Sequence, residues 1–460
     1  MKDSCWRACW LCLVLACNSG EPPPPQLQSL RLPTGALLTP NNAWLMVVNS
    51  NLDQVEDAST LVGLDLEALD AALTTGPLLP GDALTKMNPC RRTDTGAIAP
   101  IECEAQFFIK REHATRIPTG AGNIALDLPA GPTGPMRLLV PSGISRTVTW
   151  VDVLLDEGGL RLDCGQVPEG DCDSTHTLER LENNSDAERL PKDPARIFVD
   201  SSGFRYAYLP HLLGGALTLI ALDGEFGPKI TDIVTDFYPP DPDDNPFAGG
   251  FAVAQRACDP GDSPTKTMGC SRPLLYTTYR FRPDLRSFSV LTGLNRIAGG
   301  GTHHLYNVNK SQSADRPFLG DLEFEDPEVG ERLLVVHTTP PSLTLVDTSL
   351  NDERNPVNRP IASVTLCRNP NVLAVYRPTE GERLALVSCF SDDQVAVVAL
   401  GAFQVIATVE VDDGPNELVV DDLRRRLYVI NTLAGMIDLI DLDRLSPDYL
   451  RVVARVGLGD

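Results

Sequence analysis

The chain has 460 residues, 42% of them hydrophobic, and a formal net charge of −23 at pH 7. This acidity argues against nucleic acid as a partner, because binding a phosphate backbone requires a basic face. The 36 glycines and 38 prolines favour many tight turns over long helices. A chain of this length forms several domains or one large repeat architecture, so internal repeats decide between them.

Residues 1–16 have the features of a secretory signal peptide. Lys2 and Arg7 supply positive charge, and residues 8–16 form a short, mainly apolar run. The run is far below the ~20 residues that span a membrane, and its length is typical of the apolar core of a signal peptide. We therefore expect this segment to direct export and to be removed.

The end of that run, Val14-Leu15-Ala16-Cys17, resembles the lipobox of bacterial lipoproteins. The resemblance implies cleavage before Cys17, lipidation of its thiol and anchoring in a membrane; an ordinary secretory signal with a chance cysteine is the alternative. In that family an aspartate after the cysteine often signals inner-membrane retention, so Asn18 favours the outer membrane. Residues 17–30 then form a tether, which a run of prolines stiffens.

Eight further cysteines fall into four close pairs, a pattern that predicts disulfides in an exported chain. Nearest-neighbour pairing closes a short loop in every case and joins Cys90 to Cys103, Cys164 to Cys172, Cys258 to Cys270, and Cys367 to Cys389. Other pairings remain open, because proximity in sequence is the only criterion. Zinc binding is a weaker alternative, since no Cys-x-x-Cys motif follows Cys17 and no histidine flanks the pairs.

Residues 31–460 contain seven pairs of short strands rich in Val, Ile, Leu, Tyr and Thr, separated by turn-forming residues. The pairs begin near residues 43, 136, 204, 273, 332, 383 and 426. The last interval matches a bare four-stranded propeller blade of ~40–45 residues, and the longer intervals indicate loop insertions. The largest insertion covers about residues 68–120 and contains a short helix at 68–73. We expect binding specificity to reside there.

The flanking segments complete the blades. Candidate inner strands lie at 123–127, 195–200, 371–375 and 416–421, and candidate outer strands lie at 361–366, 405–409 and 450–456. The sequence therefore predicts an all-β fold, a seven-bladed β-propeller of four-stranded antiparallel blades. We expect residues 35–39 to supply an inner strand to a blade built from both ends of the chain, which would close the ring and remove exposed edges.

An aspartate recurs directly after the third strand of the blade. It stands at Asp65, Asp152, Asp223, Asp347 and Asp441. Aspartate favours turns because its carboxylate accepts hydrogen bonds from nearby backbone N–H groups. We expect these residues to cap turns and not to bind metal.

Residues 414–421 and the strand after them, Leu427-Tyr428-Val429-Ile430-Asn431, resemble the YVTN-type bacterial β-propeller repeat. The stretch from Tyr428 to Asn431 differs from the family's tetrapeptide only at Ile430, where threonine is usual. The match is firmest in the last two blades. Members of this family include surface-layer proteins, lactonase-like enzymes and many bacterial proteins without an assigned role, so the resemblance implies fold more than activity.

Candidate metal ligands are few, and they are His303, His304, Asp241 and Asp243. The two histidines precede a strand-like segment at 305–308; if that segment lined the channel, they could hold a transition metal with His211 or His337. The two aspartates lie in an acidic loop whose alternation suits Ca²⁺, although it lacks the EF-hand pattern. In both cases we favour the interpretation that these are ordinary loop residues without a metal, and we expect no cofactor.

The sequence contains no Gly-x-Ser-x-Gly elbow, P-loop or dinucleotide fingerprint, so binding is favoured over catalysis. We expect a monomer, held to the membrane by its lipid, that binds another envelope protein or acts as a scaffold. The alternatives are a propeller enzyme, either a lactonase-like hydrolase or a metal-dependent oxidoreductase, and a small-molecule sensor or carrier that uses the central channel. An enzyme would require two or more carboxylates or histidines at the channel mouth.

Overall fold

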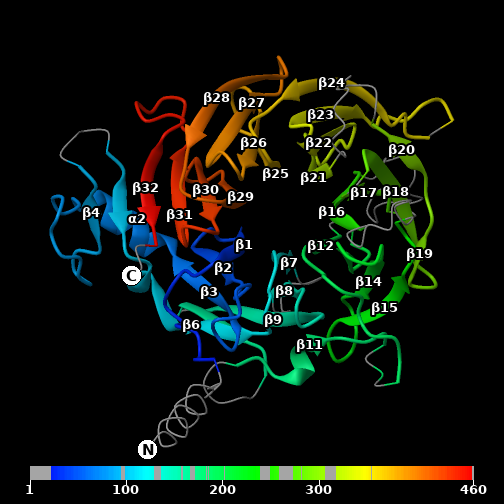
Figure 1. Cartoon of the computed structure of the whole chain (residues 1–460), viewed down its shortest axis with the longest axis horizontal. Coiled ribbons are helices and arrows are strands. Elements are labelled where there is room, and N and C mark those ends of the chain that lie inside the picture. The colour runs from blue at the N-terminus through cyan, green and yellow to red at the C-terminus, as the bar shows by residue number, and fades with distance from the viewer. Residues whose placement is uncertain are drawn as a thin grey trace, which may run out of the picture.

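The structure, a computed structural model, describes residues 22–94, 99–128, 136–156, 159–165, 171–182, 184, 186–200, 203–238, 249–257, 273–280, 282–305, 318–353 and 355–457. Seven small β-sheets are arranged in a ring around a central axis (Figure 1). The fold is a seven-bladed β-propeller of four-stranded, mostly antiparallel sheets, as the sequence predicts.

The first four blades, each given from its innermost strand outward, carry most of the insertions. Blade one consists of β1 (Pro33–Leu38), β2 (Trp44–Asn49), β3 (Ser59–Asp65) and β6 (Ile109–Ile117). Blade two consists of β7 (Ala125–Asp127), β8 (Met136–Ser142), β9 (Thr147–Asp156) and β10 (Gly159–Asp163), with β11 (Thr177–Leu178) also paired to β9. Blade three consists of β12 (Phe198–Val199), β13 (Tyr206–Pro210), β14 (Leu217–Ala221) and β15 (Lys229–Val234). Blade four consists of β16 (Gly250–Gln255), β17 (Leu275–Tyr279), β18 (Asp284–Leu291) and β19 (Arg296–Ala298), with β20 (Thr302–His304) also paired to β18.

The last three blades are more regular. Blade five consists of β21 (Phe318–Phe324), β22 (Arg332–Thr339), β23 (Ser342–Asp347) and β24 (Arg359–Thr365). Blade six consists of β25 (Pro370–Tyr376), β26 (Leu384–Cys389), β27 (Gln394–Ala399) and β28 (Gln404–Glu410). Blade seven consists of β29 (Pro415–Asp421), β30 (Arg426–Asn431), β31 (Met436–Asp441) and β32 (Val452–Val456).

The middle strands are buried on both faces, which explains their nearly continuous hydrophobic sequences. In β30, Leu427 and Val429 pack against blade six, whereas Tyr428 and Ile430 pack against blade one. Successive side chains of a strand point to opposite faces, so one strand serves two interfaces. Seven such apolar clusters fill the seven interfaces between neighbouring blades.

The short helix expected at 68–73 is present as α2 (Leu66–Thr74). Asp65 begins it, because its carboxylate accepts a hydrogen bond from the Ala68 N–H at 2.9 Å. Asp347 and Asp441 cap turns in the same way, accepting from the N–H groups two residues further on. Asp152 differs, because it forms an ion pair with Arg137 at 2.9 Å. The turn-capping prediction is thus confirmed at three of these positions.

The ring closes in a way that the sequence does not indicate. β1 is an inner strand, as predicted for residues 35–39, and packs beside β29, but it belongs to blade one, whose four strands all come from the N-terminal part of the chain. Blade seven already has its own inner strand. Its sheet is instead extended on the outer side by β5 (Ile101–Cys103), which pairs in parallel with β32, and by β4 (Cys90–Arg92). Both ends of the chain therefore contribute to one sheet, at its outer edge.

The large insertion acts as a clasp between the first and last blades. Asp70 on α2 forms ion pairs with Arg424 and Arg426 of blade seven. The clasp also contains the 3₁₀ helix Ala105–Phe107, and Leu66 and Leu69 lie in the apolar cluster between the two blades. These contacts give the insertion a structural role, separate from the binding role that the sequence led us to expect.

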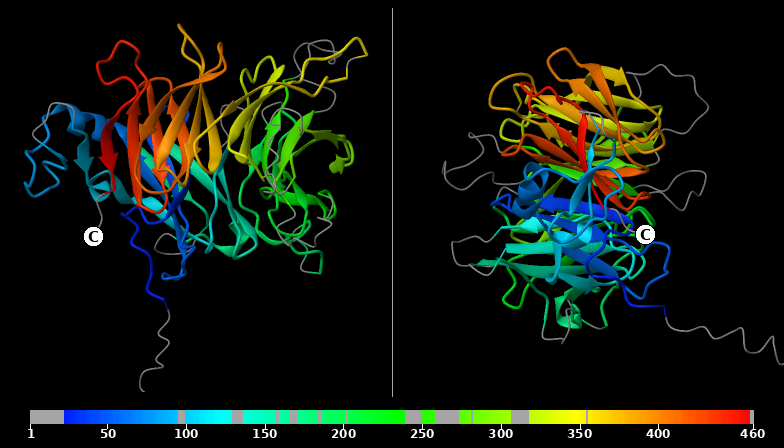
Figure 2. Two further views of the ribbon diagram at one scale, coloured as in Figure 1. Left: turned by 45° about the horizontal axis from the view of Figure 1, so that its top comes forward. Right: turned by 90° about the vertical axis from the view of Figure 1, so that its left-hand side faces the viewer.

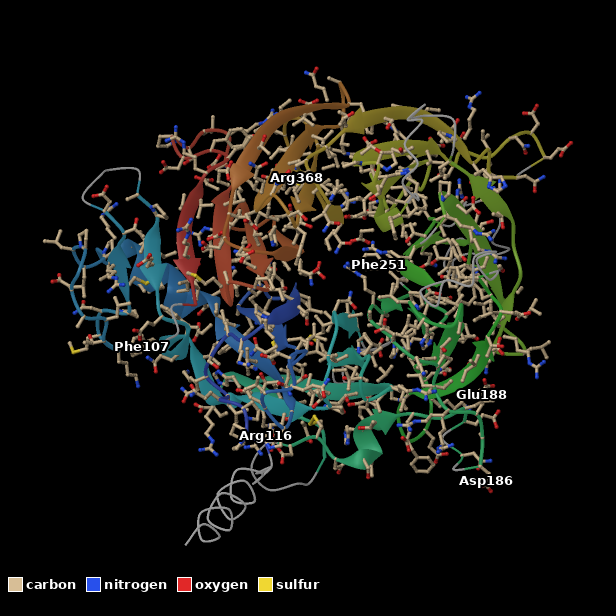
Figure 3. All side chains as sticks on the ribbon, viewed as in Figure 1. Phe107, Arg116, Asp186, Glu188, Phe251 and Arg368 are labelled. Carbon is tan, nitrogen blue, oxygen red and sulfur yellow. A yellow bond between two sulfur atoms is a disulfide. The ribbon has the colours of Figure 1, made fainter. Side chains whose placement is uncertain are left out.

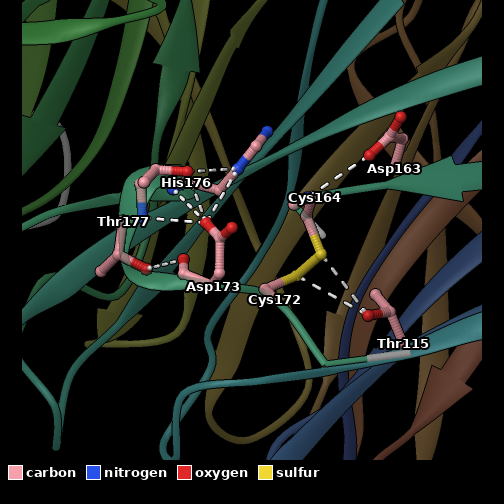
Figure 4. Close-up of a disulfide and its surroundings, with 9 residues drawn as sticks. Thr115, Asp163, Cys164, Cys172, Asp173, His176 and Thr177 are labelled. Atoms are coloured by element: carbon pink, nitrogen blue, oxygen red, sulfur yellow. Dashed lines mark hydrogen bonds and ion pairs between the residues drawn. A yellow bond between two sulfur atoms is a disulfide. The ribbon is translucent and has the colours of Figure 1, made fainter. Parts of the chain in front are cut away.

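Three of the four nearest-neighbour disulfides are present: Cys90–Cys103, Cys164–Cys172 and Cys367–Cys389. The second follows blade two, before the 3₁₀ helix Ser174–His176, and both its sulfur atoms lie beside the Thr115 hydroxyl of β6 in blade one (Figure 4). Cys258 and Cys270 lie outside the described residues, as do residues 1–16 and Cys17. Among the described residues, no helix is long and apolar enough to cross a membrane.

The segment before β1 lies on the face where the inner strands begin. The Asp57 N–H donates to the Pro23 carbonyl, and the Ser50 N–H donates to the Leu32 carbonyl. Ser50 and Asp57 lie in the connection between β2 and β3. Two further views show this blue segment on one side of the ring (Figure 2). Residues 22–32 thus lie on the same face as the channel mouth described next.

Candidate functional site: the channel mouth

Irregular pairing at the start of the inner strands directs side chains into the channel. The register between the first two strands shifts near the first residues of β1, β16, β21, β25 and β29. A β-bulge of this kind bends a strand and turns a side chain away from the regular alternation. The residues at or beside these shifts are Thr34, Phe251, Asp321, Asn371, Asn416 and Glu417. Figure 3 places Phe251 at the inner edge of the ring.

Blades two and three supply Asn123 and Arg196, which lie just before β7 and β12, and Arg280 follows β17. We call these three residues, together with the six at the register shifts, the channel mouth. Hydrogen bonds connect them from blade to blade. The Asn123 side chain accepts from the Ile197 N–H at 2.9 Å, and the Asn371 amide donates to Asn416 at 3.4 Å.

Arg196 bridges three blades. Its Nη2 atom lies 3.2 Å from Oε2 of Glu417 in blade seven and 3.4 Å from Oδ2 of Asp321 in blade five. The three side chains are only 14%, 10% and 11% exposed. Burial alone would lower the pKa of Arg196, but the two carboxylates outweigh it and raise that pKa. The guanidinium is therefore a permanent cation that two anions share.

The two carboxylates are not equally well stabilised. Asp321 also accepts from the backbone N–H groups of Leu322 at 2.9 Å and Leu373 at 3.3 Å, whereas among the described backbone N–H groups only that of Leu418 donates to Glu417, at 3.2 Å. Burial, together with the nearby charge of Asp321, raises the pKa of Glu417 to about 7, although Arg196 opposes the rise. Glu417 thus gains and loses its proton near neutral pH.

Arg280 is a second cation in the mouth, and it has no carboxylate partner. Its Nη1 donates to the Leu319 carbonyl at 2.8 Å and to Asn371 at 3.2 Å, and its guanidinium lies 4.6 Å from the Phe251 ring centre. Within the part of the chain that the structure describes, Arg280 forms no ion pair. Burial and the charge of Arg196 lower its pKa to about 10, so it remains protonated at neutral pH.

Two cavities meet at Arg196. The first, of about 250 Å³, opens at the mouth and is lined by Phe251, Glu417 and the apolar side chains of Leu52, Ile144 and Leu212. The second, of about 320 Å³, lies deeper along the inner strands and is lined by Phe198, Asp321, Leu322 and Glu323. Asn123 and Arg196 line both cavities, so the Arg196 bridge stands between them. The deeper cavity lies at the lower end of the range for ligand sites, ~300–1,000 Å³, and the first lies just below that range.

A further acid lies beside the deeper cavity. Glu323 accepts a hydrogen bond from Arg377 at 2.7 Å. Burial raises its pKa to about 7 despite that partner. The channel therefore holds acids with a raised pKa at two levels, above and below the Arg196 bridge.

The predicted metal ligands lie elsewhere. β20, which contains His303 and His304, pairs with β18 away from the axis, and β21 is the inner strand of the next blade. His303 and His304 themselves therefore lie away from the channel, and residues 306–308 lie outside the described residues. His303 bonds Ser287 at 2.9 Å and Asn358 at 3.1 Å, and His304 pairs with Asp284.

The other metal candidates are also separated. His211 is buried beside Thr218 with its pKa lowered to about 3, and His337 is buried with its pKa lowered to about 4, in both cases mainly because burial disfavours the charged ring. Asp241 and Asp243 lie outside the described residues. Among the described residues no group of three or more His, Cys, Asp or Glu side chains is placed to hold a metal ion.

Sequence reasoning missed the mouth residues although one signal was present. Three candidate inner strands begin with asparagine, at Asn123, Asn371 and Asn416, and all three side chains reach the mouth network. A polar residue recurring at the first position of inner strands points to one end of the channel, because equivalent positions of the blades surround the same axis. The charged members, by contrast, follow no repeat.

No protein-family model and no curated protein matches the sequence. Among solved structures, a candidate 6-phosphogluconolactonase from Bacteroides uniformis is similar over 83% of this chain and 86% of its own, with 10% identity and a TM-score of 0.50. Kuenenia stuttgartiensis hydrazine synthase is similar over 92% and 98%, with 12% identity and a TM-score of 0.49. The periplasmic gluconolactonase PpgL of Pseudomonas aeruginosa is similar over 84% and 87%, with 14% identity and a TM-score of 0.48. At these identities the first likeness supports the propeller fold alone.

Proposed function

We propose that this protein is a lipid-anchored propeller of the bacterial cell envelope that binds a small organic anion at its channel mouth. The observation that carries the binding role is Arg280, a buried guanidinium that pairs with no described carboxylate and lies against Phe251, a residue of the mouth cavity. Guanidinium groups recognise carboxylates and phosphates through paired, charge-assisted hydrogen bonds. Arg196 and Arg280 both approach the Phe251 ring, at 5.1 and 4.6 Å, so an anion bound between them would supply the counter-charge that Arg280 lacks.

This proposal replaces the protein-binding or scaffold role that the sequence favoured. The sequence favoured that role because it has the lipobox and the repeats and lacks a catalytic motif, and it led us to expect specificity in the insertion at about 68–120. In the structure, α2, β4 and β5 of that insertion pack onto blade seven. The mouth, in contrast, brings together ionisable groups from four blades, and two of them, Arg196 and Glu417, line a cavity of about 250 Å³. A small-molecule sensor or carrier therefore fits the geometry better than a scaffold does.

Direct titration of the purified mature protein with small anions tests the binding role. Carboxylates, phosphate and uncharged sugars would be compared by calorimetry, with Arg280→Gln as the variant and Arg368→Gln as the control. Arg368 is a suitable control because its side chain is 77% exposed and pairs only with surface groups. Losing a charged hydrogen bond costs about 1.5–3 kcal/mol, so Arg280→Gln is expected to weaken anion binding about tenfold or more. Equal affinity in both variants, or no anion binding at all, contradicts the proposal.

Hydrolysis is a second candidate, and Glu417 is the observation in its favour. The mouth carries two carboxylates, which meets the requirement set for a propeller enzyme, and a pKa of about 7 suits a general acid or base at neutral pH. A lactonase-like hydrolase is the form to test first, by assaying a panel of sugar lactones. Activity that Glu417→Gln abolishes would support it, and no turnover of any lactone would leave binding as the function.

The envelope location rests on the signal-like N-terminus and on the three disulfides, which suit an oxidising compartment. We propose that lipid on Cys17 holds a monomer to the outer membrane. Cys17→Ala is expected to shift the protein from the membrane fraction to the soluble fraction. An unlipidated wild-type protein, identified by mass spectrometry, contradicts the anchor but leaves the binding role standing.

A further inference from the structure

The mouth cavity has a charged floor and apolar walls. Arg196 and Glu417 lie at the floor, beside the bridge to Asp321. The walls include Leu52 and Ile144, which are 53% and 45% exposed. Large apolar side chains that stay exposed around a concave site indicate a surface covered by a ligand. Both side chains come from connections between the second and third strands of blades one and two, so they belong to the same face.

We propose that the ligand is a small monocarboxylate with an apolar body, and that its carboxylate takes the place of Glu417 on Arg196 while Glu417 takes up a proton from solvent. This inference rests on the proposed anion-binding function and specifies its ligand class. The carboxylate enters from the mouth side, because Glu417 lines the mouth cavity and Asp321 lines the deeper one. The apolar body then lies against Phe251, Leu212 and Ile144.

Charge balance selects a single negative charge. With Glu417 ionised, the Arg196 bridge and the neighbouring Arg280 hold two cations and two anions, Glu417 and Asp321. Asp193, a further carboxyl on the wall of the mouth cavity, has its pKa raised by burial, which favours its neutral form. A bound carboxylate beside an ionised Glu417 would add a third anion to a site closed to most of the solvent. Protonation of Glu417 restores neutrality: two cations face Asp321 and one ligand carboxylate. No covalent bond changes, and one proton moves from water to the Glu417 carboxylate.

Glu417 is the group able to take up this proton. Its pKa of about 7 already lies far above that of an exposed glutamate, and Arg196 is the charge that holds it down. Once the ligand occupies Arg196, that restraint is lost and the pKa rises further. The charged groups that face Glu417 are Arg196 and Asp321, while the strands packed beside it, β1 and β25, bring only the uncharged Thr34 and Asn371 to this end.

Asp321 is a less suitable group to be displaced. It accepts two backbone hydrogen bonds, from Leu322 and Leu373, that a ligand entering from the mouth would leave intact. Its carboxylate therefore stays on Arg196 when Glu417 leaves. The exchange keeps Arg196 paired with two carboxylates throughout, which avoids a buried cation without a partner.

Calorimetry on the full mature protein tests the inference with hexanoate as the probe. Hexanamide, which lacks the charge, and succinate, which carries two, are the comparison compounds. We expect hexanoate to bind with uptake of about one proton at pH 8, measured from buffers with different ionisation enthalpies. Its dissociation constant is expected to rise about tenfold per pH unit above the pKa of Glu417, and to be constant at lower pH. Binding without proton uptake overturns the inference.

Variants distinguish the inference from the broader proposal. Glu417→Gln is expected to bind hexanoate without proton uptake and with an affinity that does not change between pH 6 and 9. Asp392→Asn, at an exposed surface pair with Arg368, is the control and is expected to keep the wild-type pH profile. Ile144→Ser is expected to weaken hexanoate binding severalfold while leaving acetate binding unchanged.

The possible failures have separate meanings. Binding of phosphate or succinate in preference to hexanoate, or a pH profile in Glu417→Gln like that of wild type, overturns this inference and leaves anion binding in place. Failure of every anion to bind overturns both proposals. If Glu417→Gln does not fold, the proton uptake of the wild-type protein at pH 6 and at pH 8 still decides, because uptake is expected only at the higher pH.

Discussion

The interfaces between blades and the channel mouth are built on opposite principles. Each interface is a continuous apolar cluster, such as the one in which Phe288 packs edge-on against Tyr208 and Phe237 between blades three and four. The mouth instead buries Arg196, Arg280, Asp321 and Glu417. Apolar burial stabilises a fold in proportion to area, whereas buried charge is costly unless it is fully paired.

The difference indicates where function resides. Apolar side chains at the mouth would give the ring equal or greater stability, because well-packed hydrophobic residues often stabilise a protein at least as much as a buried ion pair does. The burial of Glu417, which Arg196 compensates only in part, therefore lowers the stability of the fold, and the apolar interfaces offset this loss. Such a loss of stability is expected at a binding site. Four substitutions would break or sharpen this contrast.

The largest effect is expected in an interface. Phe288→Ala removes a fully buried ring and is expected to lower the free energy of unfolding by about 3–5 kcal/mol. Phe226→Ala is the matched control, because Phe226 is 90% exposed and should be nearly neutral. Denaturant titration measures both, and anion affinity is expected to be unchanged in the folded protein. Equal midpoints for the two variants would contradict the assignment of stability to the interfaces.

Removing the central cation should have a smaller, pH-dependent effect. Arg196→Met leaves Glu417 and Asp321 without their shared partner, which costs about 3–5 kcal/mol in a closed interior. Because the channel mouth admits water, we expect about 2–3 kcal/mol at pH 8, within the range for an unsatisfied buried group. The loss should shrink in acid as the carboxylates protonate. A loss that is independent of pH would argue against charge as its cause.

Neutralising Glu417 should stabilise the protein in a defined pH window. Its folded pKa of about 7 exceeds the ordinary glutamate value of 4.5, so the stability that it contributes is present below pH 4.5 and is lost as the pH rises through 7. Glu417→Gln is therefore expected to be more stable than wild type by about 1–2 kcal/mol at pH 8, reduced from the buried limit by solvent in the mouth, and equal to it near pH 4. Denaturant titration at the two pH values checks this, and a destabilised variant at pH 8 would contradict it.

A substitution in the clasp should change the free energy of unfolding least. Asp70→Ala removes two partly exposed ion pairs, with Arg424 and Arg426, and is expected to cost about 0.5–1 kcal/mol. The ring itself should persist, because blade seven has four strands of its own. Limited proteolysis within the insertion, compared with Glu67→Ala on the same helix, would show whether the clasp loosens. Unfolding of the whole ring would mean that the clasp closes it.

The repeats could be predicted from the sequence because both faces of each middle strand are buried. Runs such as those of β26 and β30 must then be continuously apolar, and turn residues separate them at a spacing set by the blade. The helix at α2, the nearest-neighbour pairing of three disulfides and the turn-capping aspartates are local features, and they too could be predicted.

The inner strand β21 escaped prediction for a physical reason. Asp321 interrupts its apolar pattern, and a bulge shifts its register, so the strand has neither regular alternation nor a continuous hydrophobic run. The features that hide this strand are the ones that bring Asp321 to the channel. Local sequence rules fail where the chain is shaped for a site.

The sequence by itself determined the propeller, its blade count and its short-range disulfides, because these depend on periodicity and on residues close together in the chain. Only the tertiary structure placed Arg196, Asp321 and Glu417 together, since they come from blades three, five and seven and are separated by up to 221 positions. The tertiary structure also turned the large insertion into a clasp and moved His303 and His304 away from the axis. A ring brings residues that are distant in sequence together at its centre, and no local sequence pattern predicts which of them will be in contact.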